Sequence, residues 1–341
     1  MSAPEGLPRV LLSARARREL QPVIETTLGT RALELMTLED VADDDSVTVD
    51  AVFISRDVTG LSTKHSVLAE LAACHRVLRR SPKLAWVHTH SAGADRPIYA
   101  ELMARGVAVT TSSGANADIV AQTALAGLLA LSRRFPELMA AQTRRRWAPL
   151  MGGPLPPDLA GQTVVLVGWG PIARRLQPLL TLLGLRVVVV RRSSAAAASG
   201  LETVTPDRLH EVLPRAQWLL LACPLTRHTH GLIDDMALAR LPAGARVINV
   251  SRGEVIKESA LIDALQRGHL GGAFLDVFEQ EPLSAASPLW AMPGVMVTPH
   301  SAGQSAGNAA RTAALFVDNL GRWIRGEALA HRAGLEAPWT P

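Results

Sequence analysis

The feature that most limits the possible folds of this chain is an apolar run, residues 164–167, that ends in a glycine-rich turn. The turn reads Gly-x-Gly-x-x-Ala and continues into a segment of helical spacing. Gly168 permits a tight turn, Gly170 has no side chain to keep a ligand from the backbone, and Ala173 lets a helix pack closely on a sheet. The segment therefore predicts a strand, turn and helix whose free N–H groups bind the pyrophosphate of a dinucleotide. A strand–turn–helix without a ligand is the alternative.

The segments that follow this turn favour a doubly wound sheet. Six are almost continuously apolar, without period-two alternation: residues 163–167, 186–190, 218–221, 246–250, 272–275 and 295–298. Strands of this kind are typical of parallel sheets with helices on both faces. Shorter apolar runs among the first 110 residues alternate with helical spacing, so that part is also predicted to be α/β.

Length and breaks in the pattern indicate two domains. A chain of 341 residues exceeds the usual size of one hydrophobic core. Residues 117–131 form a long apolar stretch that predicts a buried helix, and residues 309–325 predict a second helix. The Gly/Pro-rich residues 152–157 predict an exposed loop, and so does the Ala/Ser-rich segment at 193–200.

Composition excludes several classes of protein. Hydrophobic residues make up 48% and charged residues 19%, which is ordinary for a globular domain. The net charge of +4 is spread along the chain, and the run at residues 144–147 is interpreted as a solvated helix face, so nucleic-acid binding is not expected. Cys74 and Cys223 lack disulfide or metal-ligand spacing, which predicts no metal and favours a reducing cytoplasm. Without a signal-type segment or a long apolar run, neither secretion nor membrane insertion is expected.

The end of the second predicted strand bears on the type of dinucleotide. An acidic residue there normally bonds the ribose 2′-hydroxyl of NAD, but this chain has Arg191, Arg192 and Ser193. Guanidinium groups and a hydroxyl suit a 2′-phosphate, which a carboxylate would repel. We therefore expect NADP(H) to be preferred, with NAD(H) possible. Two solvated arginines at a strand end are the alternative.

Three later strand ends carry polar residues that a sheet core does not need. Arg252 follows the run at 246–250, Asp276 and Glu281 follow 272–275, and His300 follows 295–298. Carboxyl ends of parallel strands share one edge, where ligands bind. Each residue alone could be an ordinary surface group. An arginine, a carboxylate and a histidine beside a dinucleotide turn together favour hydride-transfer chemistry.

On these motifs the chain resembles the D-isomer specific 2-hydroxyacid dehydrogenases, in particular their glyoxylate/hydroxypyruvate reductase-like branch. Five segments carry the resemblance: residues 168–173, 223–226 with 229–233, 249–253, 276–283 and 288–300. A weaker match covers residues 91–95 and 105–109. The resemblance implies a Rossmann cofactor domain, residues 114–299, inserted in a smaller flavodoxin-like α/β substrate domain, residues 1–113 plus 300–341. It also implies a homodimer.

The resemblance further implies roles for individual residues. Arg252 would bind the keto-acid carboxylate, His300 would exchange a proton with the substrate oxygen, and Glu281 would orient the imidazole. Backbone at Ala92 and Gly93 would receive the substrate carboxylate, and Asp276 would face the nicotinamide carboxamide. The residues expected to bind the cofactor are Gly168, Gly170, Pro171, Ile172, Arg191, Arg192, Ser193, Cys223, Pro224, Thr229, Val250, Ser251, Arg252, Asp276 and His300.

The implied function is NADP(H)-dependent reduction of a small 2-keto acid to the D-2-hydroxy acid, and the reverse. Gln122 and Lys257 depart from the family pattern, which usually has acidic residues there. The main alternative is a corepressor-like protein that senses nucleotide without turnover. A formate- or phosphite-oxidising relative is a second one. The pairing of Glu281 with His300 argues against the formate type and less against the phosphite type.

Overall fold

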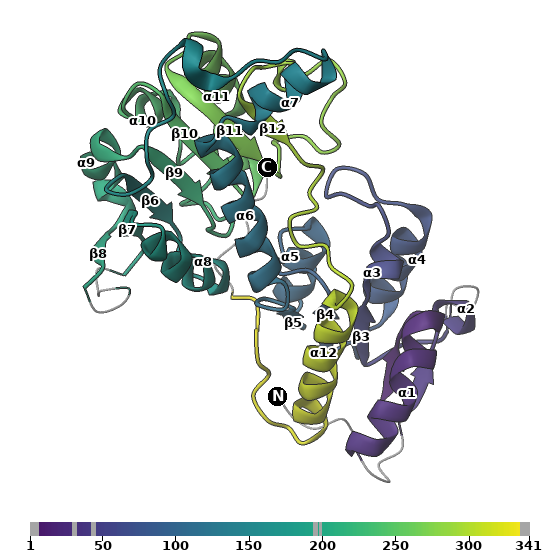
Figure 1. The fold of residues 1–341 in the computed structure, drawn as a ribbon. Coiled ribbons are helices and arrows are strands. Elements are labelled where there is room, and N and C mark those ends of the chain that lie inside the picture. Colours follow the sequence, from purple (N-terminus) through teal and green to yellow (C-terminus); the bar gives the residue numbers. More distant parts are fainter. Residues whose placement is uncertain (1–6, 29–32, 42–45, 194–196, 198–199, 335–341) are drawn as a thin grey trace. The chain divides into compact units, whose positions relative to one another are not determined.

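Two parallel sheets, each with helices on both faces, organise the part of the chain that the computed structural model describes (Figure 1). The described residues are 7–28, 33–41, 46–193, 197 and 200–334. The chain divides into unit 1, Met1–Asn116 with Ser305–Pro341, and unit 2, Ala117–Gln304, so unit 2 is inserted in the sequence of unit 1. The boundaries predicted near Ser113 and Pro299 lie a few residues before these limits.

Unit 1 contains a five-stranded sheet with the order β2-β1-β3-β4-β5. Its strands are β1 (Arg9–Leu11), β2 (Glu34–Met36), β3 (Ala51–Ile54), β4 (Trp86–Thr89) and β5 (Ala108–Thr111). Its helices are α1 (Ala14–Leu28), α2 (Leu38–Val41), α3 (Arg56–Thr59), α4 (Ala69–Arg80), α5 (Pro97–Ala104) and α12 (Asn308–Ile324). This strand order is that of flavodoxin-like folds, as the resemblance implied.

Alternate side chains of these strands enter different clusters, because successive residues of a strand point to opposite faces. Leu11 and Val52 pack in one buried cluster with α4 and α5. Val10 and Phe53 pack in another with α1 and α12. The Phe53 ring stacks on Phe316 of α12, with ring centroids 4.6 Å apart. The segment at the C-terminal end of the chain thus completes the core of the unit that the N-terminal part begins.

Buried histidines make the stability of unit 1 sensitive to acid. Burial lowers the pKa of His75 to about 4 and that of His88 to about 3. Both folded values lie below the ordinary histidine value of about 6.5, so the unfolded chain binds more protons as the pH falls through this range. The stabilisation is complete above about pH 6.5 and is lost as the pH falls toward the folded values.

We therefore expect the free energy of unfolding, measured with urea, to fall between pH 7 and pH 5. Each histidine contributes at most about 1.4 kcal/mol per pH unit. His88 is bonded through Nδ1 to Thr110 Oγ1 (2.7 Å) and through Nε2 to Ser112 Oγ (3.0 Å). Glutamine at position 88 can keep hydrogen bonds but cannot titrate, so His88→Gln should flatten the pH dependence. If the free energy of unfolding changed equally with pH in the wild type and in His88→Gln, His88 would not contribute to the acid sensitivity.

Unit 2 contains a seven-stranded sheet with the order β12-β11-β10-β9-β6-β7-β8. Its strands are β6 (Thr163–Val167), β7 (Arg186–Val190), β8 (Glu202–Val204), β9 (Trp218–Leu221), β10 (Ala245–Asn249), β11 (Leu270–Leu275) and β12 (Val295–Val297). Its α-helices are α6 (Ala117–Ser132), α7 (Phe135–Thr143), α8 (Pro171–Leu182), α9 (Leu209–Val212), α10 (Asp235–Ala239) and α11 (Glu258–Gln266). Its 3-10 helices are η1 (Leu150–Gly152), η2 (Pro206–Arg208), η3 (Leu213–Arg215), η4 (Gly253–Val255) and η5 (Pro288–Trp290).

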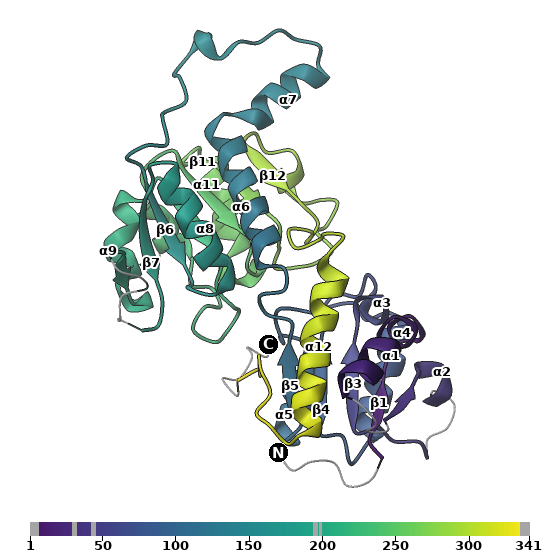
Figure 2. The same ribbon diagram turned by 60° about the horizontal axis from the view of Figure 1, so that its bottom comes forward.

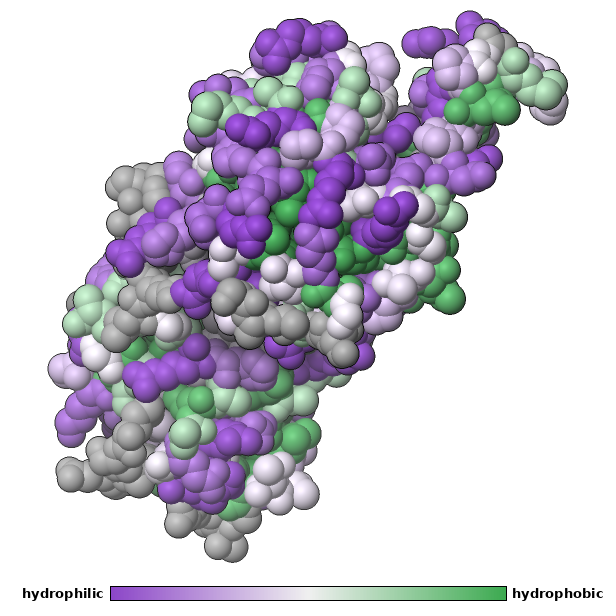
Figure 3. Space-filling view, turned by 90° about the vertical axis from the view of Figure 1, so that its left-hand side faces the viewer, coloured by the Kyte–Doolittle hydropathy of each residue, from purple (hydrophilic) through white to green (hydrophobic). Residues whose placement is uncertain are grey.

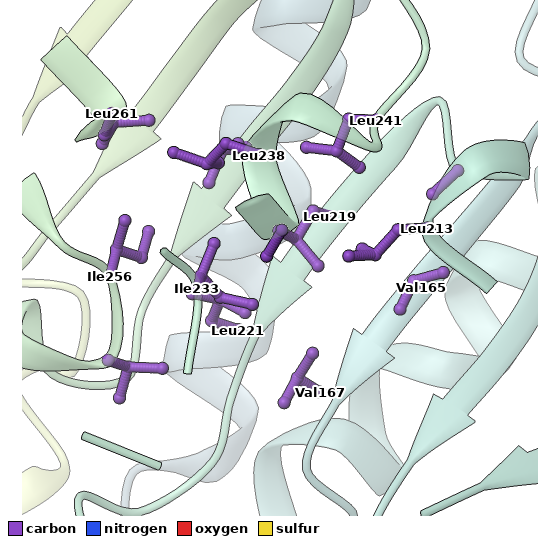
Figure 4. Close-up of a cluster of buried hydrophobic side chains, with 14 of the residues drawn as sticks. Val165, Val167, Leu213, Leu219, Leu221, Ile233, Leu238, Leu241, Ile256 and Leu261 are labelled. Atoms are coloured by element: carbon purple, nitrogen blue, oxygen red, sulfur yellow. The ribbon is translucent and has the colours of Figure 1, made fainter. Parts of the chain in front are cut away.

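Helices cover both faces of this sheet, as the apolar strands predicted. Val164 and Leu166 of β6 pack in a cluster with α6 and α8. Val165 and Val167 pack in a second cluster with α9, α10 and α11, and Figure 4 shows these valines beside leucines and isoleucines from neighbouring strands, helices and connecting loops. The strand order, with the reversal beside β6, is the doubly wound Rossmann arrangement. The predicted fold class is confirmed.

Two local features of unit 2 differ from the sequence predictions. β8 was missed because it is three residues long and only one of them is buried. The basic run begins after α7 ends, so Arg144 and Arg145 lie in an exposed turn and not on a helix face. Figure 2 shows α7 and the following segment extending beyond the sheet and the other helices of unit 2. Part of the predicted loop at 193–200 lies outside the described residues.

The surface of the described residues is mostly hydrophilic. Hydrophilic residues cover most of the face drawn in Figure 3, and hydrophobic ones form small groups among them. No helix in the described ranges is long and apolar enough to span a bilayer. Within the same ranges, no group of three or more His, Cys, Asp or Glu residues is arranged to hold a metal ion. Cys74 and Cys223 are both buried and free.

Candidate active site

The glycine-rich turn joins β6 to α8 in a form that fits a pyrophosphate. Gly168 has φ +104°, and a Cβ there would lie 2.8 Å from the carbonyl oxygen of Ala222, so another residue would be strained and would clash. Gly170 caps α8, and a Cβ there would meet nothing within 4 Å, which leaves open space at the helix start. Pro171 and Ile172 form the first turn of α8. Free N–H groups at this helix start suit the pyrophosphate of a dinucleotide.

At the end of β7 the structure places cationic and hydroxyl groups. Arg191 is half-buried, and its backbone N–H donates to the carbonyl oxygen of Val204 on β8 (3.0 Å). Arg192 and Ser193 are exposed. No acidic residue stands directly at this strand end, where an adenosine ribose lies in folds of this kind. Two guanidinium groups at this position can bind a 2′-phosphate on that ribose more strongly than they can bind an unmodified 2′-hydroxyl.

The end of β9 supplies a closed turn. The hydroxyl of Thr229 donates to the carbonyl oxygen of Pro224 (2.7 Å) and accepts from the N–H of Thr226 (2.8 Å). Cys223 is buried beside β9, and burial raises the pKa of its thiol to about 12. Because the thiolate is the reactive form, this thiol packs and does not act as a nucleophile near neutral pH.

Asn249 shapes the turn that presents Arg252 after β10. Its Oδ1 accepts the N–H and the hydroxyl of Ser251 at 3.0 and 2.8 Å, and its Nδ2 donates to the carbonyl oxygen of Arg252 (3.0 Å). Val250 and Ser251 are buried, whereas Arg252 is half-buried. One guanidinium nitrogen of Arg252 donates to the carbonyl oxygen of Ser251 (2.8 Å). This turn-forming role of Asn249 was not predicted from the sequence, because its bonds depend on the local backbone conformation.

Asp276, at the end of β11, anchors the segment that carries His300. Its Oδ1 accepts the hydroxyl of Thr298 (2.7 Å) and the N–H groups of Ser301 (2.8 Å) and Ala302 (3.0 Å). The backbone oxygen of Asp276 accepts the N–H of His300 (2.8 Å). Burial raises the pKa of this carboxyl, against the effect of its hydrogen bonds. This anchoring was missed from the sequence, because its partners lie 22 to 26 residues away; contact with a carboxamide stays a prediction.

Glu281 and His300 form a hydrogen-bonded pair. Oε2 of Glu281 lies 2.8 Å from Nδ1 of His300, and Oε1 accepts the N–H of Phe278 (3.2 Å). The side chain of Glu281 is 16% exposed and that of His300 is 49% exposed. Burial alone would raise the pKa of Glu281, but the hydrogen bond and charge of His300 hold it below its ordinary value.

The backbone at His300 is unusual and suggests a functional constraint. Its φ is +50°, in the left-handed region that residues other than glycine rarely adopt. Such conformations are often found at functional sites, where the surrounding contacts stabilise the strained backbone. The bond to Glu281 engages Nδ1, which leaves Nε2 as the ring atom to face a substrate. An imidazole oriented in this way can donate a proton or accept one.

The candidate residues fall in different units. Arg252, Glu281 and His300 follow the neighbouring strands β10, β11 and β12 of unit 2, and the charge of Arg252 contributes to the lowered pKa of Glu281. Ala92 and Gly93 follow β4 in unit 1. The carbonyl oxygen of Ser91 accepts the N–H of Ser112 (2.9 Å), which ties this loop to the end of β5. A role for Ala92 and Gly93 in substrate binding stays a prediction.

Comparison with known proteins identifies the family. The model of the "D-isomer specific 2-hydroxyacid dehydrogenase, NAD binding domain" matches residues 125–302. The chain is 34% identical to the (S)-sulfolactate dehydrogenase of Chromohalobacter salexigens, over 83% of this chain and 93% of that protein. It is 33% identical to the glyoxylate reductase of Korarchaeum cryptofilum, over 74% of this chain and 76% of that protein.

A solved structure gives the same result over almost the whole chain. The D-isomer specific 2-hydroxyacid dehydrogenase of Xanthobacter autotrophicus Py2, in complex with NADPH and MES, superposes with a TM-score of 0.77 at 28% identity. The match covers 98% of this chain and 100% of the other. The chain belongs to the D-isomer specific 2-hydroxyacid dehydrogenase family, whose members are NAD(P)-dependent enzymes that act on a CH–OH group.

Proposed function

We propose that the protein reduces a small 2-keto acid of the glyoxylate or hydroxypyruvate type to its D-2-hydroxy acid with NADPH, and catalyses the reverse reaction. The observation that carries the proposal is the 2.8 Å pair of His300 and Glu281 beside Arg252 in a unit with a dinucleotide-type turn. The similarity to a glyoxylate reductase supports the substrate class.

Three side chains account for the chemistry around the carbonyl. Arg252 binds the substrate carboxylate by a charge-assisted bond and polarises the carbonyl oxygen. His300 donates the Nε2 proton to that oxygen, while the carboxylate of Glu281 orients the ring and stabilises its positive charge. The nicotinamide, when bound, supplies the hydride to the carbonyl carbon. In the reverse direction His300 removes the hydroxyl proton.

NADPH oxidation, followed optically, tests the proposed function. The substrate panel should contain glyoxylate, hydroxypyruvate, pyruvate and bulkier 2-keto acids, and each assay should be repeated with NADH. The similarity to an (S)-sulfolactate dehydrogenase adds (S)-sulfolactate with NADP⁺ in the oxidative direction. Turnover of a small 2-keto acid supports the proposal. NADPH binding without turnover of any substrate contradicts it and favours a nucleotide-sensing protein.

We also propose that Arg191 and Arg192 select NADP(H), which the NADPH in the similar Xanthobacter structure supports. Replacing both with alanine should lower the ratio of kcat/KM for NADPH to kcat/KM for NADH by about 10- to 100-fold, because bonds to a charged phosphate are each worth about 1.5–3 kcal/mol. Arg186→Ala, at the opposite end of β7, is the matched control and should leave the ratio unchanged. A ratio that does not fall in the double variant removes both arginines from cofactor selection.

We propose a homodimer formed through α7 and the segment after it. Large apolar side chains are exposed there, and they are Phe135 (48%), Met139 (49%), Trp147 (95%), Met151 (83%) and Leu155 (68%). Apolar groups concentrated on a projecting segment are typical of an interaction surface. The variant Phe135→Asp/Trp147→Asp should elute as a monomer where the wild type elutes as a dimer. Met236→Asp, at a 62% exposed methionine on α10, is the control; a monomeric wild type would contradict the proposal.

A further inference from the structure

The loop after Arg252 lies directly against the loop that leads to Glu281. β10 and β11 pair in parallel, with Asn249 opposite Leu275 at their ends. Gly253, the next residue after Arg252, is buried, and a Cβ at this position would lie 1.8 Å from the carbonyl carbon of Phe278. The two backbones therefore touch with no side chain between them.

A pair of reciprocal hydrogen bonds joins the same two loops. The N–H of Glu258 donates to Oε1 of Glu279 (2.8 Å), and the N–H of Glu279 donates to Oε2 of Glu258 (3.1 Å). Glu258 is the first residue of α11, so the Glu279 carboxylate also lies at the positive end of a helix dipole. Bonds to an ionised acceptor are shorter and stronger than neutral ones. We refer to this pair of bonds as the Glu258–Glu279 clasp.

The clasp lies close in sequence to two candidate catalytic residues. Glu281 follows Glu279 by two residues, and its own Oε1 accepts the N–H of Phe278. The orientation of the Glu281 carboxylate toward His300 therefore depends on the backbone at 278–279. On the other side, residues 253–257 connect Arg252 to Glu258, and the turn η4 occupies most of this connection. Movement at the clasp would change the spacing of both groups.

We propose that Glu258 and Glu279 are positioning residues, whose reciprocal bonds hold Arg252 and the Glu281–His300 pair at the spacing that one keto acid requires. The proposal rests on the proposed function. The direct contact of Gly253 with Phe278 keeps the loops together when the clasp is lost, so the fold survives while the alignment loosens. A misplacement of about 1 Å can cost up to about 10²-fold in rate, and partial loosening costs less.

The test compares Glu279→Ala with the conservative Glu279→Gln. The glutamine oxygen can still accept the N–H of Glu258, whereas alanine cannot. Asp263→Ala is the matched control, because Asp263 is an exposed carboxylate on the same helix, paired with Arg267 at 2.8 Å. We expect kcat/KM for glyoxylate to fall about 10-fold in Glu279→Ala, to recover most of this loss in Glu279→Gln, and to stay unchanged in Asp263→Ala. NADPH affinity should be the same in all four proteins.

Two outcomes overturn the inference. One is a kcat/KM within twofold of wild type in Glu279→Ala, even if the Tm falls, since a merely structural residue would lower the Tm alone. The other is an equal loss in Glu279→Gln and Glu279→Ala, which would show that the hydrogen-bond acceptor is not what matters.

A measurement that does not depend on enzymatic turnover tests this inference separately from the proposed function. If wild type reduces no 2-keto acid, the proposed function fails while the clasp remains testable by NMR of the His300 imidazole. Its ring resonances should shift in Glu279→Ala and stay in place in Asp263→Ala. Unchanged ring resonances in Glu279→Ala overturn the clasp.

Discussion

Replacing His300 with asparagine is expected to lower kcat for 2-keto acid reduction by about 10²–10⁴-fold, the usual contribution of a general acid. The imidazole is held by Glu281 at 2.8 Å, and asparagine has no titrating group to replace it. NADPH affinity should change far less than kcat, because His300 is one of many residues expected to bind the cofactor and the others, including those of the glycine-rich turn after β6, are retained. Steady-state kinetics at saturating NADPH, together with a fluorescence titration of NADPH, provide the measurement.

Asparagine is a more informative substitution than alanine because of the backbone conformation at position 300. With φ at +50°, alanine at position 300 would keep a strained conformation, whereas asparagine tolerates the left-handed region. A large loss in His300→Asn therefore reports the missing proton donor and not a displaced loop. Undiminished turnover would remove His300 from the mechanism. Glu281→Gln, which keeps a hydrogen-bonding group but not the charge, should lose less than His300→Asn.

The framework around this site could be predicted from the sequence because it depends on local patterns. Three strands, β6, β7 and β9, match the predicted ranges, and the glycine-rich turn lies between β6 and α8 as expected. Buried parallel strands leave long apolar runs, which a single sequence shows plainly. β8 could not be found in this way, since a strand at the edge of the sheet with three residues leaves little apolar pattern.

Groups held by contacts distant in sequence could not be predicted. The sequence indicates that Arg252, Glu281 and His300 each follow a strand. Because these strands are parallel, all three residues lie at the same edge of the sheet. Nothing in the sequence indicates that Asp276 accepts three bonds from residues 298–302, or that Glu258 and Glu279 bond each other across 21 residues. The boundaries of the two units follow from packing, which local patterns define only within a few residues.

Replacing Arg252 with alanine is expected to lower kcat/KM for the keto acid by about 10²–10³-fold. Truncating one partner of a hydrogen-bonded charge pair costs about 2–5 kcal/mol, and each factor of ten in rate corresponds to about 1.4 kcal/mol. The loss should include a higher KM, since the guanidinium binds the carboxylate in the ground state as well as in the transition state.

The lysine variant and a surface control distinguish substrate binding from simple loss of charge. Arg252→Lys keeps the positive charge but lacks the planar fork that can bond a carboxylate and a carbonyl together, so it should recover only part of the activity. Arg267→Ala, which breaks an exposed ion pair with Asp263, should behave as wild type. NADPH affinity, measured by fluorescence titration, should fall much less than kcat/KM for the keto acid in the two Arg252 variants and should be unchanged in Arg267→Ala. If NADPH affinity alone fell in Arg252→Ala, the guanidinium would belong to the cofactor site, and another cation would have to bind the substrate carboxylate.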